Sequence, residues 1–417
     1  MNAMNRLPNI LVVGTGDTKC EELQFMASVI REAGGLPVMI DVSVLGDPPY
    51  APEYSRHDIA KAAGTSIVAI AASGDENSAM ELMAKGAAAL TRSLYDAGQA
   101  DGVIILGGSM GTDLALDVAA ALPLGVPKFV VSTIAYSHLL PPERIAPDLM
   151  MILWAGGLYG LNGICRSVLS QACGAVVGAA RFGTKPDKER PLIGMTSLGS
   201  SCLKYMKYLK PELERRGYDV AVFHATGMGG RAFEAIAAQN GFTAVFDFCI
   251  QEVSNHHHGT VVTSGPDRLE NAGRAGIPQL VAPGAVDMVD LPAWQALPAA
   301  LAGRPYHAHN RLLGSVTTSP EGRREIARII GGKLAVTSAE VAFILPLKGI
   351  QEWDKPVEPL HEPEALDAFI DEMRRAVPSS VSLHEIDSHI NAPEFSAKAL
   401  AIFDDWIARG VIPGGRP

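Results

Sequence analysis

Two glycine-rich segments in the first half of the chain have residue types suited to holding an anion. Gly14–Lys19 reads Gly-Thr-Gly-Asp-Thr-Lys and follows a short apolar run. Gly107–Thr112 reads Gly-Gly-Ser-Met-Gly-Thr and follows the strongest strand-like run of this half. Glycines let backbone N–H groups approach a ligand, and the free N–H groups at a helix start favour negative charge. Lys19 would add a positive charge to the first segment.

Neither segment has the spacing of a standard nucleotide fingerprint. The GxxxxGK[ST] pattern of a Walker A loop is absent from Gly14–Lys19, and Gly107–Thr112 lacks the GxGxxG spacing of dinucleotide-binding proteins. Each segment also has a structural interpretation, a plain tight turn for the first and close helix–strand packing for the second. Ser132 and Thr133 end the next apolar run and would bring hydroxyl donors to the same crevice. The sequence therefore predicts a site for an anionic, phosphate-bearing small molecule.

The second half of the chain offers candidates for acid–base chemistry. His224 stands before a second glycine-rich turn, Asp287 follows Pro-Gly-Ala-Val, and His309 comes a little later. Asp287 with His309 would make an acid–base pair, for which the alternative is a carboxylate that caps a turn. His224 is equally well explained as a packing residue at a strand end. We take these three as candidate catalytic residues, with Asn255 and His258 as groups that would orient a substrate.

The adjacent histidines 256–258 and the cysteines do not indicate a metal site or a reactive thiol. Adjacent side chains point in different directions and no HExxH motif is present, so we predict no metal site. Cys202 stands near a predicted helix N-terminus, which can lower a thiol pKa, but a buried inert cysteine is the favoured interpretation. The 5 cysteines are scattered without CxxC spacing, which indicates a reduced, cytoplasmic setting.

The elements that must position these groups alternate along the chain. Strand-like runs are expected at 9–13, 36–41, 102–106, 127–132, 192–196, 219–224, 244–250, 278–282 and 339–346. Amphipathic helices are expected at 21–33, 75–95, 113–121, 201–216, 231–239, 364–376 and 393–407. This alternation predicts an α/β protein of two Rossmann-like domains with mostly parallel sheets. The charged segment 182–190 marks the boundary, so we expect domains at 1–184 and 185–417.

Composition excludes several classes of partner. The chain has 417 residues, 47% of them hydrophobic and 19% charged, which suits a globular protein with two cores. Its formal net charge of −10 disfavours nucleic acid and anionic membranes. No apolar run reaches the roughly 18–20 residues of a membrane span, and the N-terminus lacks a signal peptide's apolar stretch. We therefore expect a cytoplasmic protein that binds neither nucleic acid nor a membrane.

A series of motifs, in order along nearly the whole chain, resembles one known family. The motifs are GTGDTK, GGSMGTD, PKFVVSTIA, FHATGMGG, GIPQLVAPGAVD, HAHN and DSHINAPEF. Together they resemble the bacterial family homologous to the ATP-binding N-terminal part of the tomato mosaic virus resistance protein. The resemblance implies two Rossmann-like domains, ATP held mostly by the N-terminal domain near the inter-domain cleft, and a homodimer. It leaves open whether Mg²⁺ accompanies the nucleotide.

The resemblance also implies a set of nucleotide-binding residues. Carried over by motif, these are Asp17, Thr18, Lys19, Arg56, Gly108, Ser109, Met110, Gly111, Thr112, Ser132, Thr133, Ala135, Asn162, Thr196 and Ser197. The chain departs from the family pattern in places. Met110 stands where a glycine is common, and Thr196-Ser197 stands where the family more often has Thr-Thr-Pro-Cys. Val316 replaces an arginine before a Thr-Thr pair.

Three functions fit these observations. The first is an ATP-binding protein whose nucleotide is a bound ligand or regulator. The second is an enzyme that acts on a small phosphorylated or carboxylated metabolite through the His/Asp/Asn cluster of the second half. The third is a protein-interaction module, as in the plant relative, whose viral partner we do not transfer. The sequence leaves open whether the protein is an enzyme, because Rossmann-like folds serve many functions.

Overall fold

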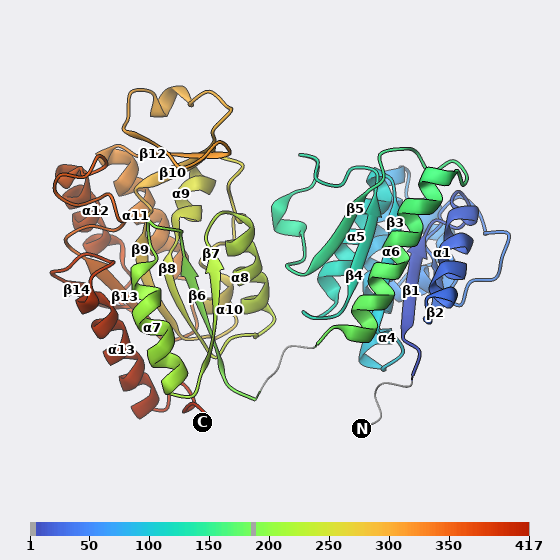
Figure 1. The fold of residues 1–417 in the computed structure, drawn as a ribbon, viewed down its shortest axis with the longest axis horizontal. Helices are drawn as coiled ribbons and strands as arrows, with labels where there is room; N and C mark the ends of the chain where they lie inside the picture. The colour runs from blue at the N-terminus through green and yellow to red at the C-terminus, as the bar shows by residue number, and fades with distance from the viewer. Residues whose placement is uncertain (1–5, 185–188, 417) are drawn as a thin grey trace. The chain divides into compact units, whose positions relative to one another are not determined.

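The computed structural model describes residues 6–184 and 189–416. The chain divides into two compact units, Met1–Pro186 and Asp187–Pro417, which we call unit 1 and unit 2 (Figure 1). Each unit is an α/β structure built on a parallel sheet, as the alternating sequence pattern predicts. The predicted boundary between residues 184 and 185 falls at the start of 185–188, which lie outside the described residues.

Unit 1 is built on a five-stranded parallel sheet with the order β2-β1-β3-β4-β5. The strands are β1 (Asn9–Gly14), β2 (Leu36–Asp41), β3 (Gly102–Gly107), β4 (Lys128–Ser132) and β5 (Leu149–Leu153). Strand β2 lies on one side of β1, and β3, β4 and β5 follow on the other side. The direction in which strands are added to the sheet therefore reverses between β1 and β3. In open sheets of this kind, ligands bind outside the carboxyl ends of the strands at that reversal.

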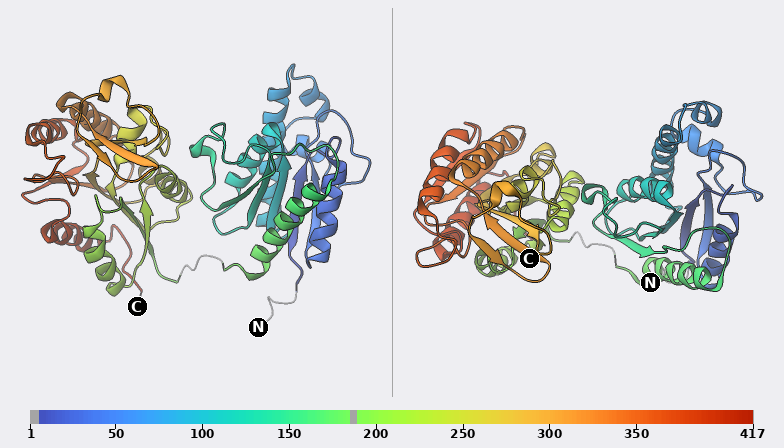
Figure 2. Two further views of the ribbon diagram at one scale, coloured as in Figure 1. Left: turned by 45° about the horizontal axis from the view of Figure 1, so that its top comes forward. Right: turned by 90° about the horizontal axis from the view of Figure 1, so that it is seen from above.

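Helices cover both faces of this sheet (Figure 2). They are α1 (Cys20–Glu32), α2 (Arg56–Ala62), α3 (Ile67–Ala71), α4 (Glu76–Asp96), α5 (Ser109–Ala121) and α6 (Gly163–Phe182), with a short 3-10 turn, η1 (Pro142–Arg144). Along β1, Leu11 and Val13 enter the core beneath α4 and α5, whereas Ile10 and Val12 enter the core beneath α1 and α6. Strand side chains alternate between faces, so a strand buried on both sides is apolar throughout.

One described helix, α6, is long and apolar enough to cross a membrane by length and composition. Its apolar residues Leu169, Cys173 and Val176 are fully buried in the core shared with α1 and the sheet. Of its apolar 18-residue window, 33% is buried, and a single helix of this kind is weak evidence for a membrane span. The predicted cytoplasmic location stays a prediction.

Unit 2 contains a six-stranded parallel sheet with the order β14-β13-β9-β8-β6-β7. The strands are β6 (Leu192–Ser197), β7 (Asp219–His224), β8 (Ala244–Cys249), β9 (Gln279–Gly284), β13 (Val341–Pro346) and β14 (Ser382–Ile386). The helices are α7 (Lys204–Arg215), α8 (Met228–Ala238), α9 (Gln251–His257), α10 (Asn271–Arg274), α11 (Pro320–Leu334), α12 (Pro363–Ala376) and α13 (Pro393–Ala408). Here the strand order reverses between β6 and β8.

A small antiparallel sheet is inserted between β9 and α11. Its strands are β10 (Met288–Pro292), β11 (Tyr306–Ala308) and β12 (Leu313–Thr317), in the order β10-β12-β11, with a short turn η2 (Ala299–Leu301) between the first two. In Figure 1, β10 and β12 lie above the parallel strands of unit 2. The sequence analysis did not predict this insertion, nor β5, α6, α11 and β14.

The glycine-rich turns are shorter than the sequence suggests. Helix α5 begins at Ser109 and not at Asp113, and α8 begins at Met228 and not at Arg231. The first helical hydrogen bond of α5 already joins the Thr112 N–H to the Gly108 carbonyl at 2.8 Å. Glycine and serine have low helix propensity, but burial of α5 against the sheet overrides it. Part of each predicted loop is therefore the first turn of a helix.

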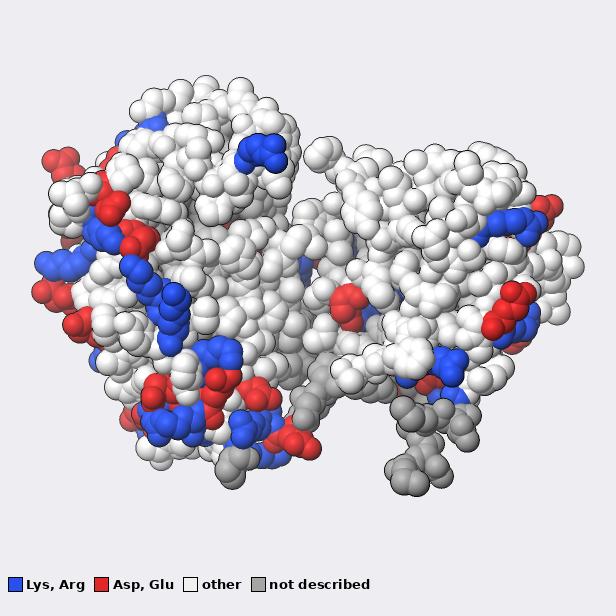
Figure 3. Space-filling model, viewed as in Figure 1, with Lys and Arg blue, Asp and Glu red and all other residues white. Residues whose placement is uncertain are grey.

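The surface carries charges of both signs. On the face shown in Figure 3, lysine, arginine and carboxylate side chains are interspersed over α7, where Glu212 and Glu214 pair with Arg215 and Lys210. Such a mixture is an ordinary solvated helix face.

Candidate nucleotide site

A cavity of about 850 Å³ opens in unit 1 where the strand order reverses. Its floor comes from the loops that follow β1 and β3, at the place where doubly wound sheets bind ligands. The residues lining it are Thr15, Asp17, Thr18, Lys19, Val44, Leu45, Ala71, Ala72, Gly74, Asp75, Glu76, Ala79, Met80, Leu106, Gly107, Gly108, Ser109, Met110, Gly111 and Tyr159. Seven of the residues implied by the resemblance are therefore brought together here: Asp17, Thr18, Lys19, Gly108, Ser109, Met110 and Gly111.

The N-terminus of α5 forms one wall of this cavity. Its N-cap residue is Gly108, so no side chain caps the helix, and its first turn contains no acidic residue. The first N–H groups of a helix lack partners inside the helix, and the helix dipole makes this end positive. The first turn of α5 therefore offers unpaired donors and partial positive charge to a ligand in the cavity.

Two adjacent glycines at this end have different roles. A Cβ atom on Gly107 would lie 2.5 Å from the Cα of Gly111, so this glycine is required for close packing of α5 on β3. A Cβ atom on Gly108 would meet no atom closer than the Thr133 Oγ1, at 3.8 Å, and the φ angle of Gly108 is −72°. The packing explanation thus accounts for Gly107 but not for Gly108.

The loop after β1 is a tight turn that also lines the cavity. The Gly16 N–H donates to Asp41 Oδ1 at 3.0 Å, and a Cβ on Gly16 would lie 2.8 Å from the Pro48 Cβ. The Thr15 and Thr18 hydroxyls are 2.9 Å apart. The Lys19 Nζ lies 5.2 Å from the centre of the Tyr159 ring, a cation–π contact. Among the described residues that line the cavity, Lys19 is the one lysine or arginine.

The opposite wall is apolar with an acidic corner, and the sequence analysis missed it. Val44, Leu45, Ala71, Ala72, Ala79 and Met80 form the apolar part. Asp75 and Glu76 stand at the start of α4, where the Asp75 side chain accepts from the Ser78 N–H at 2.9 Å. These hydrogen bonds from Ser78 lower the pKa of Asp75. In the sequence, Asp75 is an N-cap signal that indicates where α4 begins, but nothing in the sequence indicates that these residues line a cavity.

The other residues implied by the resemblance do not line the cavity, although some of them hold its walls in place. Arg56 begins α2 and donates to Asp47 at 2.7 Å and to the carbonyl of Val44 at 2.9 Å, which fixes one lining residue. Thr112 and Ser132 are fully buried and share a 2.7 Å hydrogen bond between α5 and β4. Thr133 and Ala135 follow β4 and do not line the cavity.

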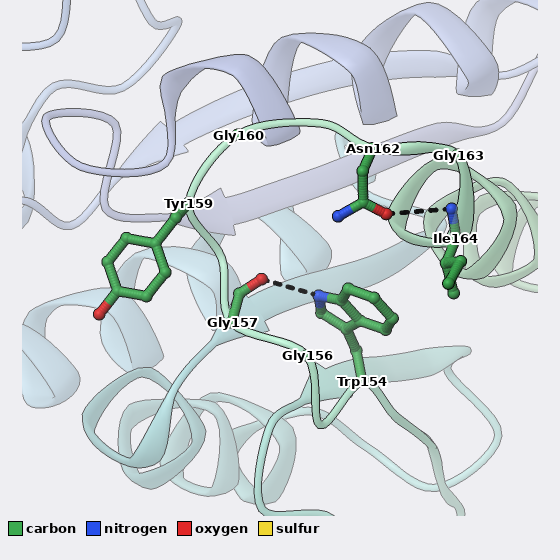
Figure 4. Close-up of a pocket in the computed structure, with 8 residues that line it drawn as sticks. All are labelled: Trp154, Gly156, Gly157, Tyr159, Gly160, Asn162, Gly163 and Ile164. Atoms are coloured by element: carbon green, nitrogen blue, oxygen red, sulfur yellow. Dashed lines mark hydrogen bonds between the residues drawn. The ribbon is translucent and has the colours of Figure 1, made fainter.

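Asn162 lies in a separate, shallow pocket shown in Figure 4. Its Oδ1 accepts hydrogen bonds from the Ile164 and Cys165 N–H groups, both at 3.0 Å, so Asn162 caps α6. Trp154 Nε1 donates to the Gly157 carbonyl at 3.2 Å in the same loop. Tyr159 projects from the other side of this loop (Figure 4) and lines both the shallow pocket and the 850 Å³ cavity.

Thr196 and Ser197 end β6 in unit 2 and are buried. The Thr196 Oγ1 donates to Asp247 Oδ1 at 2.7 Å and accepts from the Cys249 N–H at 3.0 Å. This hydroxyl therefore joins β6 to β8 inside unit 2.

The candidate catalytic residues do not form one group. His224 and His309 line a small pocket of about 30 Å³ in unit 2, together with His307 and Asp290. Asp287 is fully buried elsewhere, where its Oδ2 accepts from the Gln351 Nε2 at 3.2 Å and lies 3.9 Å from Arg323 Nη1. Burial raises the pKa of Asp287 to about 6, against the opposing charge of Arg323. The carboxylate beside His309 is thus Asp290 and not the predicted Asp287.

The remaining candidates have structural roles. Asn255 is buried, accepts from the Asp290 N–H at 2.8 Å and donates to the Val262 carbonyl at 2.9 Å. The His258 ring contacts the Ser254 carbonyl at 2.9 Å at the end of α9. Among the described residues, no group of three or more histidine, cysteine or acidic side chains could hold a metal ion. Cys202 is fully buried, and burial raises the pKa of its thiol well above the usual value.

The fold and the cavity define a class of protein made of two doubly wound α/β units, with a ligand-sized cavity at the strand reversal of the first. The chain belongs to the uncharacterised protein family UPF0261: residues 8–185 match the model of its N-terminal domain and residues 190–407 that of its C-terminal domain. The resemblance seen in the sequence motifs is confirmed.

Relatives of this chain occur in bacteria and in a plant. A UPF0261 protein of Brucella melitensis is 71% identical over 415 residues, covering 100% of this chain and 99% of the relative. A UPF0261 protein of Clostridium tetani is 35% identical over 93% of this chain and 96% of its own length. The ToMV resistance protein Tm-1(GCR237) of Solanum lycopersicum is 27% identical over 97% of this chain, but the match covers 56% of the plant protein.

Two of the solved structures that match the chain resemble it remotely. The glycosyltransferase SsfS6 of Streptomyces sp. SF2575, in complex with thymidine diphosphate, is 17% identical with a TM-score of 0.21, over 66% of this chain and 82% of that one. An S. aureus MnaA–UDP structure is 10% identical with a TM-score of 0.19, over 98% and 99%. Similarity at this level carries no functional argument.

Proposed function

We propose that unit 1 binds a nucleotide, ATP, in the 850 Å³ cavity, with the phosphates at the N-terminus of α5. The observation that carries the proposal is the uncapped start of α5 at Gly108, which opens into a ligand-sized cavity at the strand reversal. The volume falls in the range of small-molecule sites, about 300–1,000 Å³. The resemblance to the ATP-binding part of the plant resistance protein supports the same choice of ligand.

The phosphate end of the cavity has the chemistry that an anion needs. Unpaired N–H groups at the start of α5 donate to phosphate oxygens, and Gly108 lets the backbone approach them without a side chain in the way. Lys19 supplies a positive charge from the loop after β1, and the Ser109, Thr15 and Thr18 hydroxyls supply further donors. Met110 also lines the cavity, at a position where the family commonly has a glycine.

The rest of the cavity suits the nucleoside. Ala71, Ala72 and Met80 offer an apolar surface to a base, and carboxylates accept hydrogen bonds from ribose hydroxyls in many nucleotide sites. Asp75 and Glu76 are placed for that role. Asp17 has one carboxylate oxygen without a hydrogen-bond partner among the described residues, and it would hold Mg²⁺ if the metal accompanies the phosphates. The homodimer implied by the resemblance stays a prediction.

Calorimetric titration of the full chain with ATP, with and without Mg²⁺, tests the proposal. Ser109 is exposed at the first position of α5, so Ser109→Trp fills the phosphate end without entering the core. Ser93→Trp is the matched control, because Ser93 is exposed on α4 and does not line the cavity. We expect the wild type and Ser93→Trp to bind with equal affinity and Ser109→Trp to lose binding. Absence of binding in the wild type, or equal binding by both variants, would reject the assignment.

A further inference from the structure

The small pocket of unit 2 lies at the carboxyl ends of β6 and β7, beside the point where the strand order of the parallel sheet reverses. Leu198, Gly199 and Ser201 reach it from the loop after β6, and His224 and Thr226 from the end of β7. The inserted antiparallel sheet supplies the other side, with Asp290 from β10, His307 from β11 and Ser315 from β12. Ligands of open α/β sheets bind outside the carboxyl ends of the strands. The insertion therefore folds a set of polar side chains over an expected ligand site.

Asp290 is a buried carboxyl group with an unused oxygen. Its side chain is 1% exposed. Its Oδ1 accepts from Ser315 Oγ at 2.6 Å and from Gln251 Nε2 at 2.8 Å, whereas its Oδ2 is buried with no hydrogen-bond partner among the described residues. Leaving a buried polar atom unsatisfied costs about 1–3 kcal/mol, so native structures rarely keep one without a reason. The pocket beside Asp290 supplies room for such a partner.

Three imidazoles share this pocket. The Gly199 N–H donates to His224 Nδ1 at 3.4 Å, which leaves the Nε2 of a neutral His224 as a donor. The His307 ring stacks on Trp353 at 4.1 Å between ring centres and lies 6.4 Å from the His309 ring. Burial, and then the charge of His309, lower the pKa values of His224 and His307. A positive charge on His309 therefore disfavours protonation of His224 and of His307.

We propose that this pocket binds the carboxylate group of a small organic acid among His224, His307 and His309, and that binding draws a proton into the site. The volume of about 30 Å³ admits one carboxylate group in place of one or two waters, while the rest of the acid stays outside. Imidazole N–H groups donate to the ligand oxygens. This inference does not depend on nucleotide binding by unit 1.

The coupling to a proton follows from the charges that face the pocket. These are the three histidines and Asp290, and none of the described residues that line the pocket is a lysine or an arginine. A bound anion offsets the repulsion between imidazolium groups, so it raises the pKa values of His224 and His307. Burial raises the pKa of Asp290, against the hydrogen bonds from Ser315 and Gln251 and the charge of His309, and a protonated Oδ2 would donate to the ligand. Each of these shifts makes binding tighter as the pH falls from about 7 toward 6.

The test is a pH titration of the histidine ring signals of the full chain by NMR, with assignments from His→Gln variants. Acetate, glycolate and inorganic phosphate are the probes, each compared with chloride at equal ionic strength. We expect acetate or glycolate to raise the apparent pKa values of His224 and His307 by about half a unit or more. His384 is the internal control, because burial lowers its pKa too but it lies on β14 and does not line the pocket.

The variant His309→Gln sharpens the test. His309 is exposed, so its replacement leaves the fold intact. In chloride, the pKa values of His224 and His307 should rise because the repulsion from His309 is gone, and the response to carboxylates should shrink. The proposal is overturned if neither carboxylate moves the two histidines, if His384 moves equally, or if phosphate alone acts. A response abolished by a chelator would assign a metal to the pocket instead and would also overturn it.

Discussion

Replacing Gly107 and Gly108 separately by alanine should separate packing from ligand binding at the start of α5. A methyl group on Gly107 would sit 2.5 Å from the Gly111 Cα, a backbone contact that can be relieved only by moving α5 away from β3. Overpacking of this kind costs roughly 1–3 kcal/mol. A methyl group on Gly108 would have no atom nearer than 3.8 Å, and the φ angle of Gly108 is −72°, which alanine adopts without strain. Gly108→Ala should therefore leave the free energy of unfolding within about 0.5 kcal/mol of the wild-type value or raise it slightly.

The two measurements are a thermal melt and an ATP titration of each variant. A loss of about 1–3 kcal/mol in a domain of this size lowers Tm by roughly 2–12 °C for Gly107→Ala. Gly108→Ala should keep the wild-type Tm but bind ATP about tenfold more weakly, because the methyl group separates the phosphate from the backbone N–H groups. The reasoning is refuted if Gly108→Ala binds ATP like the wild type, or if it is the less stable of the two variants.

Further predictions concern charge and burial. Lys19→Met should weaken ATP binding about threefold to tenfold and flatten its salt dependence, measured by titration at two ionic strengths; an unchanged salt slope would remove Lys19 from the site. Arg268→Met should destabilise unit 2 by about 3–5 kcal/mol in urea denaturation, because it leaves the buried Asp247 and Glu252 carboxylates unpaired. The control Arg274→Met removes an exposed charge and should change stability by less than about 0.5 kcal/mol; equal losses would contradict this account. A thiol reagent should leave Cys202 unmodified in the native protein, since the residue is fully buried, and fast labelling would contradict the structure.

Much of the parallel framework could be predicted from the sequence, since a strand buried on both faces is an unbroken apolar run. Leu36–Asp41 and Asp219–His224 begin and end where the sequence places them. Helix α6 was missed because its glycines, alanines and serines blur the 3.6-residue pattern, although its buried face is continuous. The inserted sheet was missed because β11 has only 3 residues and depends on pairing with β12 for its extended shape.

The phosphate end of the cavity could be predicted from the sequence because its residues follow strand ends directly. The apolar wall around Ala71 and Met80 could not, because those residues reach the cavity only through the packing of α3 and α4 on the sheet. The sequence analysis predicted Asp287 as the carboxylate beside His309, whereas the structure has Asp290 there. This error has a similar cause. Asp287 is only a few positions away, but it stands before β10 and is buried against Arg323, whereas Asp290 lies within β10 and lines the pocket.

The most direct test of nucleotide binding by unit 1 is a crystal structure of the full chain grown with a non-hydrolysable ATP analogue. The account predicts phosphate oxygens within hydrogen-bond distance of the Ser109 and Met110 N–H groups, with the base against Ala71 and Met80. A nucleotide bound elsewhere, or an empty cavity at a saturating concentration of the analogue, would contradict it.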